Sequence, residues 1–282
     1  MSTSRYDFKE TDPFAPIVYI YQNTALLHEE KTEYQALQVR QHPYFGRMLI
    51  LDGVVQLTER DEFFYHEMLV HPVLHAHPDP KHVLIIGGGD GGSLREVLRH
   101  KGVESVTMAE IDQRVVAVSK EYFPTLRTGF DDPRAKVIFT DGIKHVEAPP
   151  RLYDAIIVDS TDPVGPAVNL FSADFYKAAV DALTPNGLFV TQSESLMFHA
   201  GFVSEVHNRL KAAFTIADCY AQAIATYAGN WWTFSVGSKE LNPRTPKRKP
   251  RIDARYYSSE VHRKAFLPRT LMKKLAARTI DW

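Results

Sequence analysis

Glycines and carboxylates at the ends of predicted strands are the residues best placed to do chemistry in this sequence. A glycine-rich loop, residues 87–92 (GGGDGG), follows a short apolar run and precedes a stretch with helical spacing. Glycines let a backbone approach a ligand closely, and a helix N-terminus offers free N–H groups. Glu110 ends the next predicted strand, where a carboxylate can accept hydrogen bonds from both ribose hydroxyls. The loop and Glu110 together predict a nucleoside-binding site.

The carboxylate of Asp90 within this loop limits which nucleosides could bind there. Asp90 stands where a pyrophosphate, or the carboxylate of S-adenosylmethionine, would lie. Two negative groups at such close range repel each other unless one is protonated. If the ligand lacks its carboxylate, the ammonium that remains can pair with Asp90. The sequence therefore favours a cationic nucleoside, and it disfavours a nicotinamide dehydrogenase or a methyltransferase that uses ordinary S-adenosylmethionine.

A second acidic pair, Asp159 and Asp162, follows the predicted strand 155–159. Ligands of open α/β sheets bind beyond the carboxyl ends of the strands, so both side chains should face the crevice that contains Asp90 and Glu110. Four carboxylates in one crevice need cations to balance their charge. A metal ion that prefers oxygen ligands and an organic polycation are the two candidates. The nucleoside features give a metal no role, so we favour the polycation and predict no metal site.

Several other motifs have structural explanations as well. Asp162-Pro163 can also initiate a turn, and Asp141-Gly142, after the predicted strand 136–140, can form a turn or accept from an adenine amino group. The histidines within residues 66–82 lack the converging spacing of a zinc site. Trp231-Trp232 is predicted to pack in the core or at its rim.

The predicted elements that position these residues fall into two regions. Residues 17–57 are rich in β-branched and aromatic residues, which indicates a small antiparallel β unit with strands at 17–21, 35–40 and 47–51 and a hairpin turn at Asp52-Gly53. From residue 81 on, apolar runs alternate with helical stretches, which is typical of βαβ units and a parallel, doubly wound sheet. The predicted strands are residues 83–86, 105–110, 136–140, 155–159 and 187–192, and the helices are 93–100, 113–122, 172–183 and 201–214.

The last part of the chain is less regular. We predict a late edge strand at residues 233–237, a basic loop at 242–251 that forms a solvated face, and a helical stretch at 258–277. The whole pattern predicts an α/β fold with two domains, an N-terminal β domain of residues 1–60 and a Rossmann-like domain of residues 61–282.

The composition excludes some classes of partner. The 282 residues carry a formal net charge of −1, so neither nucleic acid nor a membrane surface is expected as a partner. The N-terminal residues lack the apolar region of a secretory signal, and no run of about 18 apolar residues indicates a transmembrane helix. The single cysteine, Cys219, cannot form an internal disulfide and is predicted to be a small buried residue. We therefore expect a cytoplasmic protein.

Taken together, these motifs closely resemble the spermidine synthase family. The resemblance extends over roughly residues 21–232, and its matching segments are 51–56 (LDGVVQ), 59–68 (ERDEFFYHEM), 87–92, 110–112, 141–142, 159–163 and 165–166. It implies an N-terminal β domain followed by a methyltransferase-like Rossmann domain, and a homodimer or homotetramer. It also implies transfer of the aminopropyl group of decarboxylated S-adenosylmethionine, a co-substrate and not a bound cofactor, to putrescine, giving spermidine and 5'-methylthioadenosine.

The resemblance also implies roles for individual residues. Asp159 would be the general base, and Asp90 would hold the aminopropyl ammonium. The methylthioadenosine part of the donor would contact Gln35, Gln56, Gly87, Asp90, Glu110, Asp141, Gly142 and Pro166. The amine would be bound by Tyr65, His66, Asp90, Asp159, Ser160, Thr161, Asp162, Glu194 and Tyr227.

The acceptor side departs from the family pattern in two segments, residues 192–195 and 225–230. Agmatine, cadaverine and spermidine therefore stay open as alternative acceptors, and a polyamine sensor without catalysis is a further alternative. Residues 163–172 are expected to close over the site.

Overall fold

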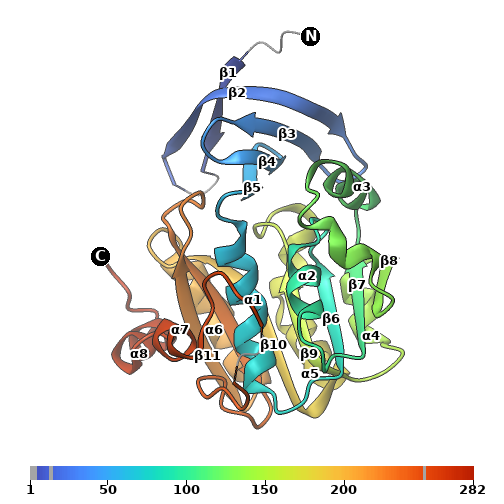
Figure 1. Ribbon diagram of the computed structural model, residues 1–282. Helices are drawn as coiled ribbons and strands as arrows, with labels where there is room; N and C mark the ends of the chain where they lie inside the picture. The colour runs from blue at the N-terminus through green and yellow to red at the C-terminus, as the bar shows by residue number, and fades with distance from the viewer. Residues whose placement is uncertain (1–4, 13–14, 250–251) are drawn as a thin grey trace.

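The N-terminal strands form one antiparallel sheet in chain order. In the computed structural model, which describes residues 5–12, 15–249 and 252–282, its strands are β1 (Arg5–Thr11), β2 (Val18–Lys31), β3 (Ala36–His42), β4 (Gly46–Leu51) and β5 (Val54–Thr58). β4 and β5 are joined by the predicted turn, in which Asp52 and Gly53 have φ angles of 47° and 83°. The sheet arches over one end of the molecule (Figure 1). The predicted N-terminal β unit is thus confirmed, with two strands, β1 and β5, that the sequence pattern does not indicate.

The second sheet is mixed and has the order β11-β12-β10-β9-β6-β7-β8. Its parallel part consists of β10 (Leu183–Ser195), β9 (Tyr153–Asp159), β6 (His82–Gly87), β7 (Ser105–Glu110) and β8 (Ala135–Phe139). β12 (Trp231–Ser238) pairs antiparallel with β10 on one side and with β11 (Ile216–Ala223) on the other.

The edge strand predicted at residues 233–237 is therefore wrong in position, because β12 lies inside the sheet and β11 lies at its edge. The connection from β11 to β12 is short, and a short connection permits only antiparallel pairing. β11 itself, with the sequence IADCYAQA, has small and polar residues where a strand pattern would show β-branched ones, so its pattern is weak.

Helices cover both faces of the second sheet. α1 (Glu62–Ala76) and α2 (Gly92–Leu98) lie on one face, and α4 (Gly142–Glu147), α5 (Ala173–Ala182) and α6 (Ala200–Ala213) lie on the other. Successive side chains of β6 alternate between the two cores: Val83 and Ile85 pack with α1 and α2, whereas Leu84 and Ile86 pack with the helices opposite. These three layers confirm the predicted Rossmann-like α/β class.

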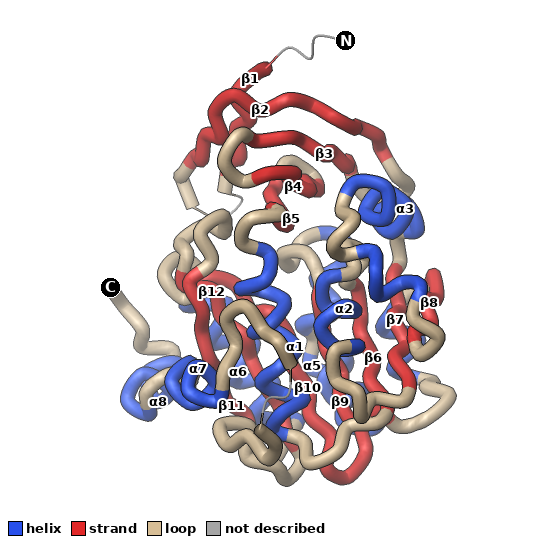
Figure 2. The backbone as a smooth tube through the Cα atoms, viewed as in Figure 1, coloured by secondary structure: helices blue, strands red, loops and turns tan. Residues whose placement is uncertain are grey.

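The N-terminal sheet is held over this unit by a separate apolar cluster. Leu37, Leu49 and Leu57 pack against Val118 of α3 (Gln113–Tyr122) and against Phe123, which follows it. A 3-10 helix, η1 (Arg127–Asp131), comes next in the chain. The chain also passes directly from β5 into α1, which packs on the second sheet (Figure 2). The N-terminal sheet therefore faces the carboxyl ends of β6 and β7, where the glycine loop and Glu110 lie.

α1 is a helix that the sequence pattern does not reveal. Nearly all of its residues are buried, including three histidines, so it has no polar face and no amphipathic period. It also contains Pro72, a residue that usually breaks a helix. Burial on all sides stabilises α1 in place of the amphipathic pattern that a prediction would need.

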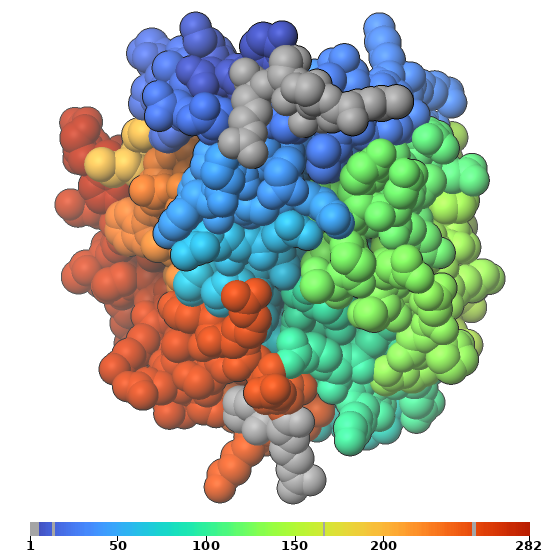
Figure 3. Space-filling view, turned by 45° about the horizontal axis from the view of Figure 1, so that its top comes forward, coloured from blue at the N-terminus to red at the C-terminus, as the bar shows by residue number. Residues whose placement is uncertain are grey.

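The residues after β12 pack along α1. Glu67, which is fully buried in α1, accepts hydrogen bonds from the backbone N–H groups of Arg255, Tyr256 and Tyr257 at 2.7, 2.8 and 2.7 Å. In the space-filling view the orange C-terminal part lies directly against the cyan segment that contains α1 (Figure 3). The predicted terminal helix is two helices, α7 (Ser259–Ala265) and α8 (Arg269–Ala277), because Pro268 separates them.

The prediction that the basic loop is a solvated face is wrong for two of its arginines. Arg248 donates to the carbonyl of Leu74 at 2.6 Å and so satisfies the C-terminal end of α1. Arg244 forms an ion pair with Asp218 at 2.6 Å. Residues 250 and 251 of this loop lie outside the described residues.

The buried histidines His75 and His100 are expected to make the fold sensitive to acid. Burial lowers the pKa of His75 from 6.5 to about 3, and burial beside His71 lowers that of His100 well below 6.5. The unfolded chain binds these protons near pH 6.5, so the stability that the neutral forms confer is full above that pH. It is lost as the pH falls toward 3, by up to about 1.4 kcal/mol per pH unit for each histidine.

Urea unfolding at about pH 7.5 and about pH 5 checks this expectation. The free energy of unfolding should fall with the pH, and the fall should be smaller in His75→Gln. Because Arg248, Tyr257 and His262 surround the same ring and are unchanged in the variant, the difference isolates His75. Equal pH dependence in the two proteins would contradict the prediction.

Candidate active site

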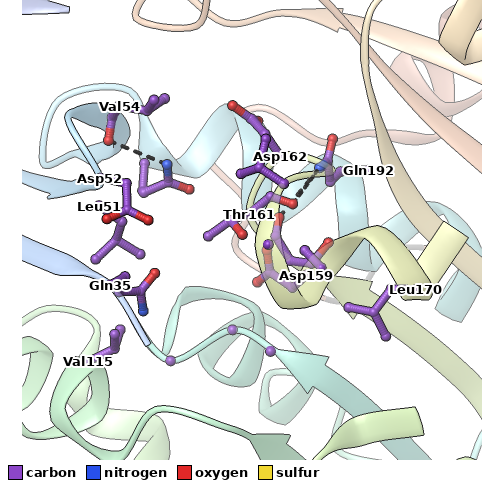
Figure 4. Close-up of a pocket in the computed structure, with 18 of the residues that line it drawn as sticks. Gln35, Leu51, Asp52, Val54, Val115, Asp159, Thr161, Asp162, Leu170 and Gln192 are labelled. Carbon is purple, nitrogen blue, oxygen red and sulfur yellow. Dashed lines mark hydrogen bonds between the residues drawn. The ribbon is translucent and has the colours of Figure 1, made fainter. Parts of the chain in front are cut away.

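One cavity of about 450 Å³ lies between the N-terminal sheet and the carboxyl ends of the parallel strands. Most of the residues predicted from the sequence line it together: Gln35, Gln56, Tyr65, Gly87, Asp90, Glu110, Asp141, Gly142, Asp159, Ser160, Thr161, Asp162, Glu194 and Tyr227. Asp159, Thr161 and Asp162 face Gln35 and Asp52 across it (Figure 4). Pro166 lies in the 3-10 helix η2 (Gly165–Phe171), and its side chain lies outside the described part of the chain. The cavity thus unites both sequence-predicted clusters.

The glycine loop lies directly against the end of β9 at the cavity. Gly87 and Gly88 have φ angles of 78° and 72°, which glycine adopts at little cost. A Cβ on Gly87 would lie 2.2 Å from the carbonyl oxygen of Asp159, and the Gly88 N–H donates to that oxygen at 2.8 Å. Only a residue without a side chain lets β9 approach the loop this closely. Asp90, in the same loop, accepts from the Gly92 N–H at 2.6 Å.

The side of the cavity that was predicted to bind a nucleoside has its own carboxylates. Burial raises the pKa of Glu110 to about 7, and its Oε1 accepts from the Asp112 N–H at 2.8 Å. The Gln35 amide donates to Asp112 at 3.0 Å. Asp141 accepts from the Ile143 N–H at 2.8 Å, so it caps α4 while lining the cavity. Both explanations of Asp141 from the sequence, a local structural role and a position at the site, are compatible with this geometry.

Asp159 lies at the centre of the cavity. The Tyr65 hydroxyl donates to its Oδ1 at 2.7 Å. Burial and the nearby carboxylate of Asp90 raise the pKa of Asp159. A buried carboxylate with a raised pKa that lines the cavity is suited to accept a proton from a bound ligand.

His66 differs from its predicted place, because it lies behind Asp90 and not on the cavity wall. Its Nδ1 is 2.7 Å from Glu62, its Nε2 is 3.2 Å from Asp90, and Arg95 holds Glu62 in turn at 2.9 Å. Burial alone would lower the pKa of His66, but the carboxylates of Asp90 and Glu62 hold it well above its ordinary value. His66 is therefore an imidazolium that donates on both sides. Although burial raises the pKa of Asp90, this imidazolium brings it below its usual range.

His66, Asp90 and Asp159 lie close enough together to be considered as a metal site. Ligand atoms of His66, Asp90 and Asp159 lie within 4.8 Å of one another, a spacing that a metal site would have. A histidine must be deprotonated to bind a metal, and both ring nitrogens of His66 face carboxylates. The geometry favours charge pairing within the protein over metal ligation.

The far end of the cavity is also acidic. Burial raises the pKa of Glu194 to about 7, and burial beside Glu194 raises that of Asp162 well above its ordinary range. Glu194 has a φ of 68° at a β-bulge between Gln192 and Ser195. A bulge beside a site can redirect a side chain, and a positive φ in a glutamate is a strain that functional sites retain. Gln192 accepts from the Glu194 N–H at 3.1 Å and donates to the carbonyl of Thr161 at 3.3 Å.

The sequence prediction of the site missed several polar lining residues, among them Glu10, Asp12, Gln192 and His199. Glu10, near the end of β1, is 4% exposed, and burial raises its pKa to about 7. His199 lies 3.2 Å from Glu194. Phe8, Glu10 and Asp12 are buried in alternation, but two of the three are acidic. The sequence therefore lacks the apolar alternation that would predict a strand here.

Aromatic side chains close the cavity beside Asp159. The rings of Tyr65 and Tyr227 lie 5.5 Å apart, and the Tyr227 hydroxyl donates to the Gln56 carbonyl at 2.5 Å. Trp232 is buried and packs on Tyr227 at 4.7 Å, whereas Trp231 is partly exposed and lies against Trp282. The predicted packing is confirmed for Trp232, whereas Trp231 is exposed and contacts Trp282 at the surface.

The Rossmann-like fold places a glycine-rich loop and a row of buried carboxylates around one cavity, an arrangement suited to an enzyme that binds small, positively charged molecules. Residues 62–247 match the family model of the spermine/spermidine synthase domain, and residues 8–59 match that of the spermidine synthase tetramerisation domain. The chain belongs to the spermine/spermidine synthase family and is an aminopropyltransferase.

Relatives of known class resemble the chain over nearly its whole length. A polyamine aminopropyltransferase of Hydrogenobaculum sp. and polyamine aminopropyltransferase 1 of Aquifex aeolicus are each 51% identical to it over 268 residues, which is 95% of this chain and 96% of theirs. A crystal structure of spermidine synthase in complex with the transition-state analogue AdoDATO has a TM-score of 0.90 and 33% identity, with 98% of both chains covered. The spermidine synthase of Thermotoga maritima has the same TM-score at 31% identity, with 98% of this chain and 97% of that one covered.

Among the described helices, none is long and apolar enough to span a membrane.

Proposed function

We propose that this enzyme transfers the aminopropyl group of decarboxylated S-adenosylmethionine to putrescine, giving spermidine and 5'-methylthioadenosine. The observation that carries the proposal is the charge of the cavity. Asp90, Glu110, Asp159, Asp162, Glu194, Glu10 and Asp12 line it, and none of the described lining residues is a lysine or an arginine. A donor with a sulfonium and an ammonium, followed by a diamine, supplies the positive charges that such a cavity needs. No bound cofactor or metal takes part, because both reacting groups arrive with the substrates.

The reaction is a direct displacement. A neutral amine nitrogen of the acceptor attacks the aminopropyl carbon next to the sulfonium, and the new C–N bond forms as the C–S bond breaks. Sulfur keeps the bonding electron pair and leaves as neutral methylthioadenosine. The attacking amine is protonated in water, with a pKa of roughly 10, so it must first lose a proton. Asp159 takes this proton, directly or through one water, while Tyr65 holds the carboxylate in place.

The positioning of the two substrates supplies much of the remaining rate enhancement. Asp90 holds the donor's ammonium, and Glu110, Asp141, Gln35 and Gln56 contact its nucleoside part. Well-oriented groups in a closed site can gain roughly 7–11 kcal/mol over a bimolecular encounter. Residues 163–172 form part of the wall, with Val164 and Leu170 in the lining, and are proposed to close over the bound pair.

The far carboxylates fix the distal ammonium of the amine, and this makes amine binding depend on pH. Burial raises the pKa of Glu10 and of Glu194 to about 7, so both are partly protonated at neutral pH. A cation binds their ionised forms. Protons are therefore released on binding, and the affinity for the amine should rise with pH through 7, by up to about tenfold per pH unit for each group.

Calorimetric titration of putrescine at about pH 6.5, in two buffers with different ionisation enthalpies, measures this proton release. Glu194→Gln should release fewer protons than the parent, since its amide does not titrate. Absence of proton exchange in the parent would contradict the assignment of the distal ammonium to these carboxylates.

The proposal as a whole is tested by a product assay with decarboxylated S-adenosylmethionine and, in parallel, putrescine, cadaverine, agmatine and spermidine. Methylthioadenosine formed with putrescine at the highest kcat/KM supports the proposal. A higher value with another amine moves the assignment to that acceptor with the chemistry unchanged. Donor binding without product from any amine would favour a polyamine sensor.

We further propose that the enzyme acts in the cytoplasm as a homodimer or homotetramer. The match of residues 8–59 to a tetramerisation domain supports the assembly. The single cysteine, Cys219, is free and buried, and burial raises the pKa of its thiol to about 12, so the fold has no need of an oxidising compartment.

A further inference from the structure

Asp61 is a buried carboxylate that joins three separate parts of the chain just before α1. It is 5% exposed. Its Oδ1 accepts from the Thr58 hydroxyl of β5 at 2.6 Å. Its Oδ2 accepts from both the N–H and the hydroxyl of Thr226, at 3.0 and 2.7 Å, across 165 positions of sequence. An ionised carboxylate can accept all three of these hydrogen bonds at once, which a neutral amide cannot.

The loop that Asp61 holds connects β11 to β12 and carries Tyr227. The carbonyl of Thr226 accepts from the Tyr21 hydroxyl of β2 at 3.1 Å, so the N-terminal sheet holds the same residue from its other side. Tyr227, the next residue, donates to the carbonyl of Gln56 at 2.5 Å. Two neighbouring residues of the loop are thus fixed to one stretch of chain, residues 56–61.

Displacement of this loop should affect the amine side most, because its one hydrogen bond to a donor-side residue in the described part of the chain is that from Tyr227 to the backbone carbonyl of Gln56. The Tyr227 ring lies 5.5 Å from that of Tyr65, whose hydroxyl holds Asp159. Glu110, at the end of β7, and Asp141, after β8, lie on the nucleoside side and have no hydrogen bond to this loop among the described residues. We propose that Asp61 is a positioning residue for the amine acceptor, acting through Thr226 on the placement of Tyr227. This inference rests on the proposed function.

The test separates the two substrates in steady-state kinetics. In Asp61→Asn, the KM for putrescine should rise about tenfold, the effect of losing one charge-assisted hydrogen bond, while the KM for the donor stays within about twofold. Thr226→Val, which keeps the N–H and removes the hydroxyl, should shift the same KM in the same direction by a smaller factor. Thr226→Val can also replace Asp61→Asn as the test variant if Asp61→Asn does not fold.

Glu67→Gln provides the matched control. Glu67 is a buried carboxylate six positions further along, and it too accepts three hydrogen bonds, but from residues 255–257. Its loss should lower the melting temperature as much as Asp61→Asn does, without changing the KM for putrescine. A double-mutant cycle of Asp61→Asn with Tyr227→Phe should give effects on this KM that are less than additive, because both act on the same ring.

The possible outcomes separate this inference from the proposed function. If the parent forms no methylthioadenosine with any amine, the proposed function fails and the role of Asp61 fails with it. If the parent is active and the folded variants keep the parental KM for putrescine, or raise the KM values of donor and amine equally, the role of Asp61 alone is overturned. A selective rise in the KM for putrescine that Glu67→Gln does not reproduce supports it.

Discussion

Asp159→Asn is expected to lower turnover by about 10²- to 10⁴-fold, the usual contribution of a general base, while donor affinity changes only a few-fold. The amide keeps the size of the side chain, and its oxygen can still accept from Tyr65, so the geometry survives. What is lost is the ability to take a proton from the amine. Single-turnover kinetics together with an equilibrium titration of the donor measure the two effects separately.

The pH profile provides the second half of this test. Burial and Asp90 raise the pKa of Asp159, so its basic form is depleted as the pH falls, and kcat/KM of the parent should decline on the acid side. This decline reports a property of the Asp90–Asp159 pair, since the two carboxylates interact. Tyr65→Phe is the matched control, because it removes the hydrogen bond to Asp159 and keeps the base. Unchanged turnover in Asp159→Asn would remove the base assignment.

Asp90→Asn is expected to abolish the preference for the decarboxylated donor. The ionised Asp90 attracts the donor's ammonium and repels the carboxylate of ordinary S-adenosylmethionine, and specificity often depends on such a repulsive element. Removal of one partner from a buried charge pair costs about 2–5 kcal/mol, so affinity for the decarboxylated donor should fall by roughly 10²-fold or more. Affinity for S-adenosylmethionine should fall less, or rise.

Calorimetric titration of the two nucleosides against the same variant gives the ratio directly. Asp141→Asn serves as the comparison, because Asp141 is proposed to contact the nucleoside end, which both donors share. It should weaken both donors by the same factor. An equal loss of affinity for both donors in Asp90→Asn would mean that Asp90 does not distinguish the decarboxylated donor from ordinary S-adenosylmethionine.

The parts of the site that lie on strand ends could be predicted from the sequence. Asp90, Glu110 and Asp159 each follow a short apolar strand, and the topology of parallel strands brings such positions to one edge of a sheet whatever the details of packing. The same logic placed the central strands and the helices between them. The local sequence pattern and the fold agree at these positions, so a single sequence is sufficient to place them at the site.

The parts that depend on contacts between distant segments could not be predicted. Glu10 reaches the cavity only because β1 lies in a sheet that covers the second unit. Glu194 was expected there from the family resemblance alone, and a bulge directs it to the cavity. His66 has the residue type of a ligand-binding group, yet Glu62 and Asp90 hold it behind the wall. α1 and β11 lack a periodic pattern, since one is buried on all sides and the other is built of small and polar residues.

The hydrogen bonds that join Thr226 to Asp61 and to Tyr21 have a consequence for the order in which the molecule is completed during synthesis. They span 165 and 205 positions of the chain, so they cannot form until the ribosome has released residues far beyond the first sheet. Translation adds roughly 5–20 residues per second, so the N-terminal sheet and Asp61 must wait on the order of ten seconds for their partner. A nascent chain stalled before Thr226 would have its nucleoside loop and Asp159 but not the wall that receives the amine. Competence to bind the donor should therefore arise earlier in synthesis than competence to use it.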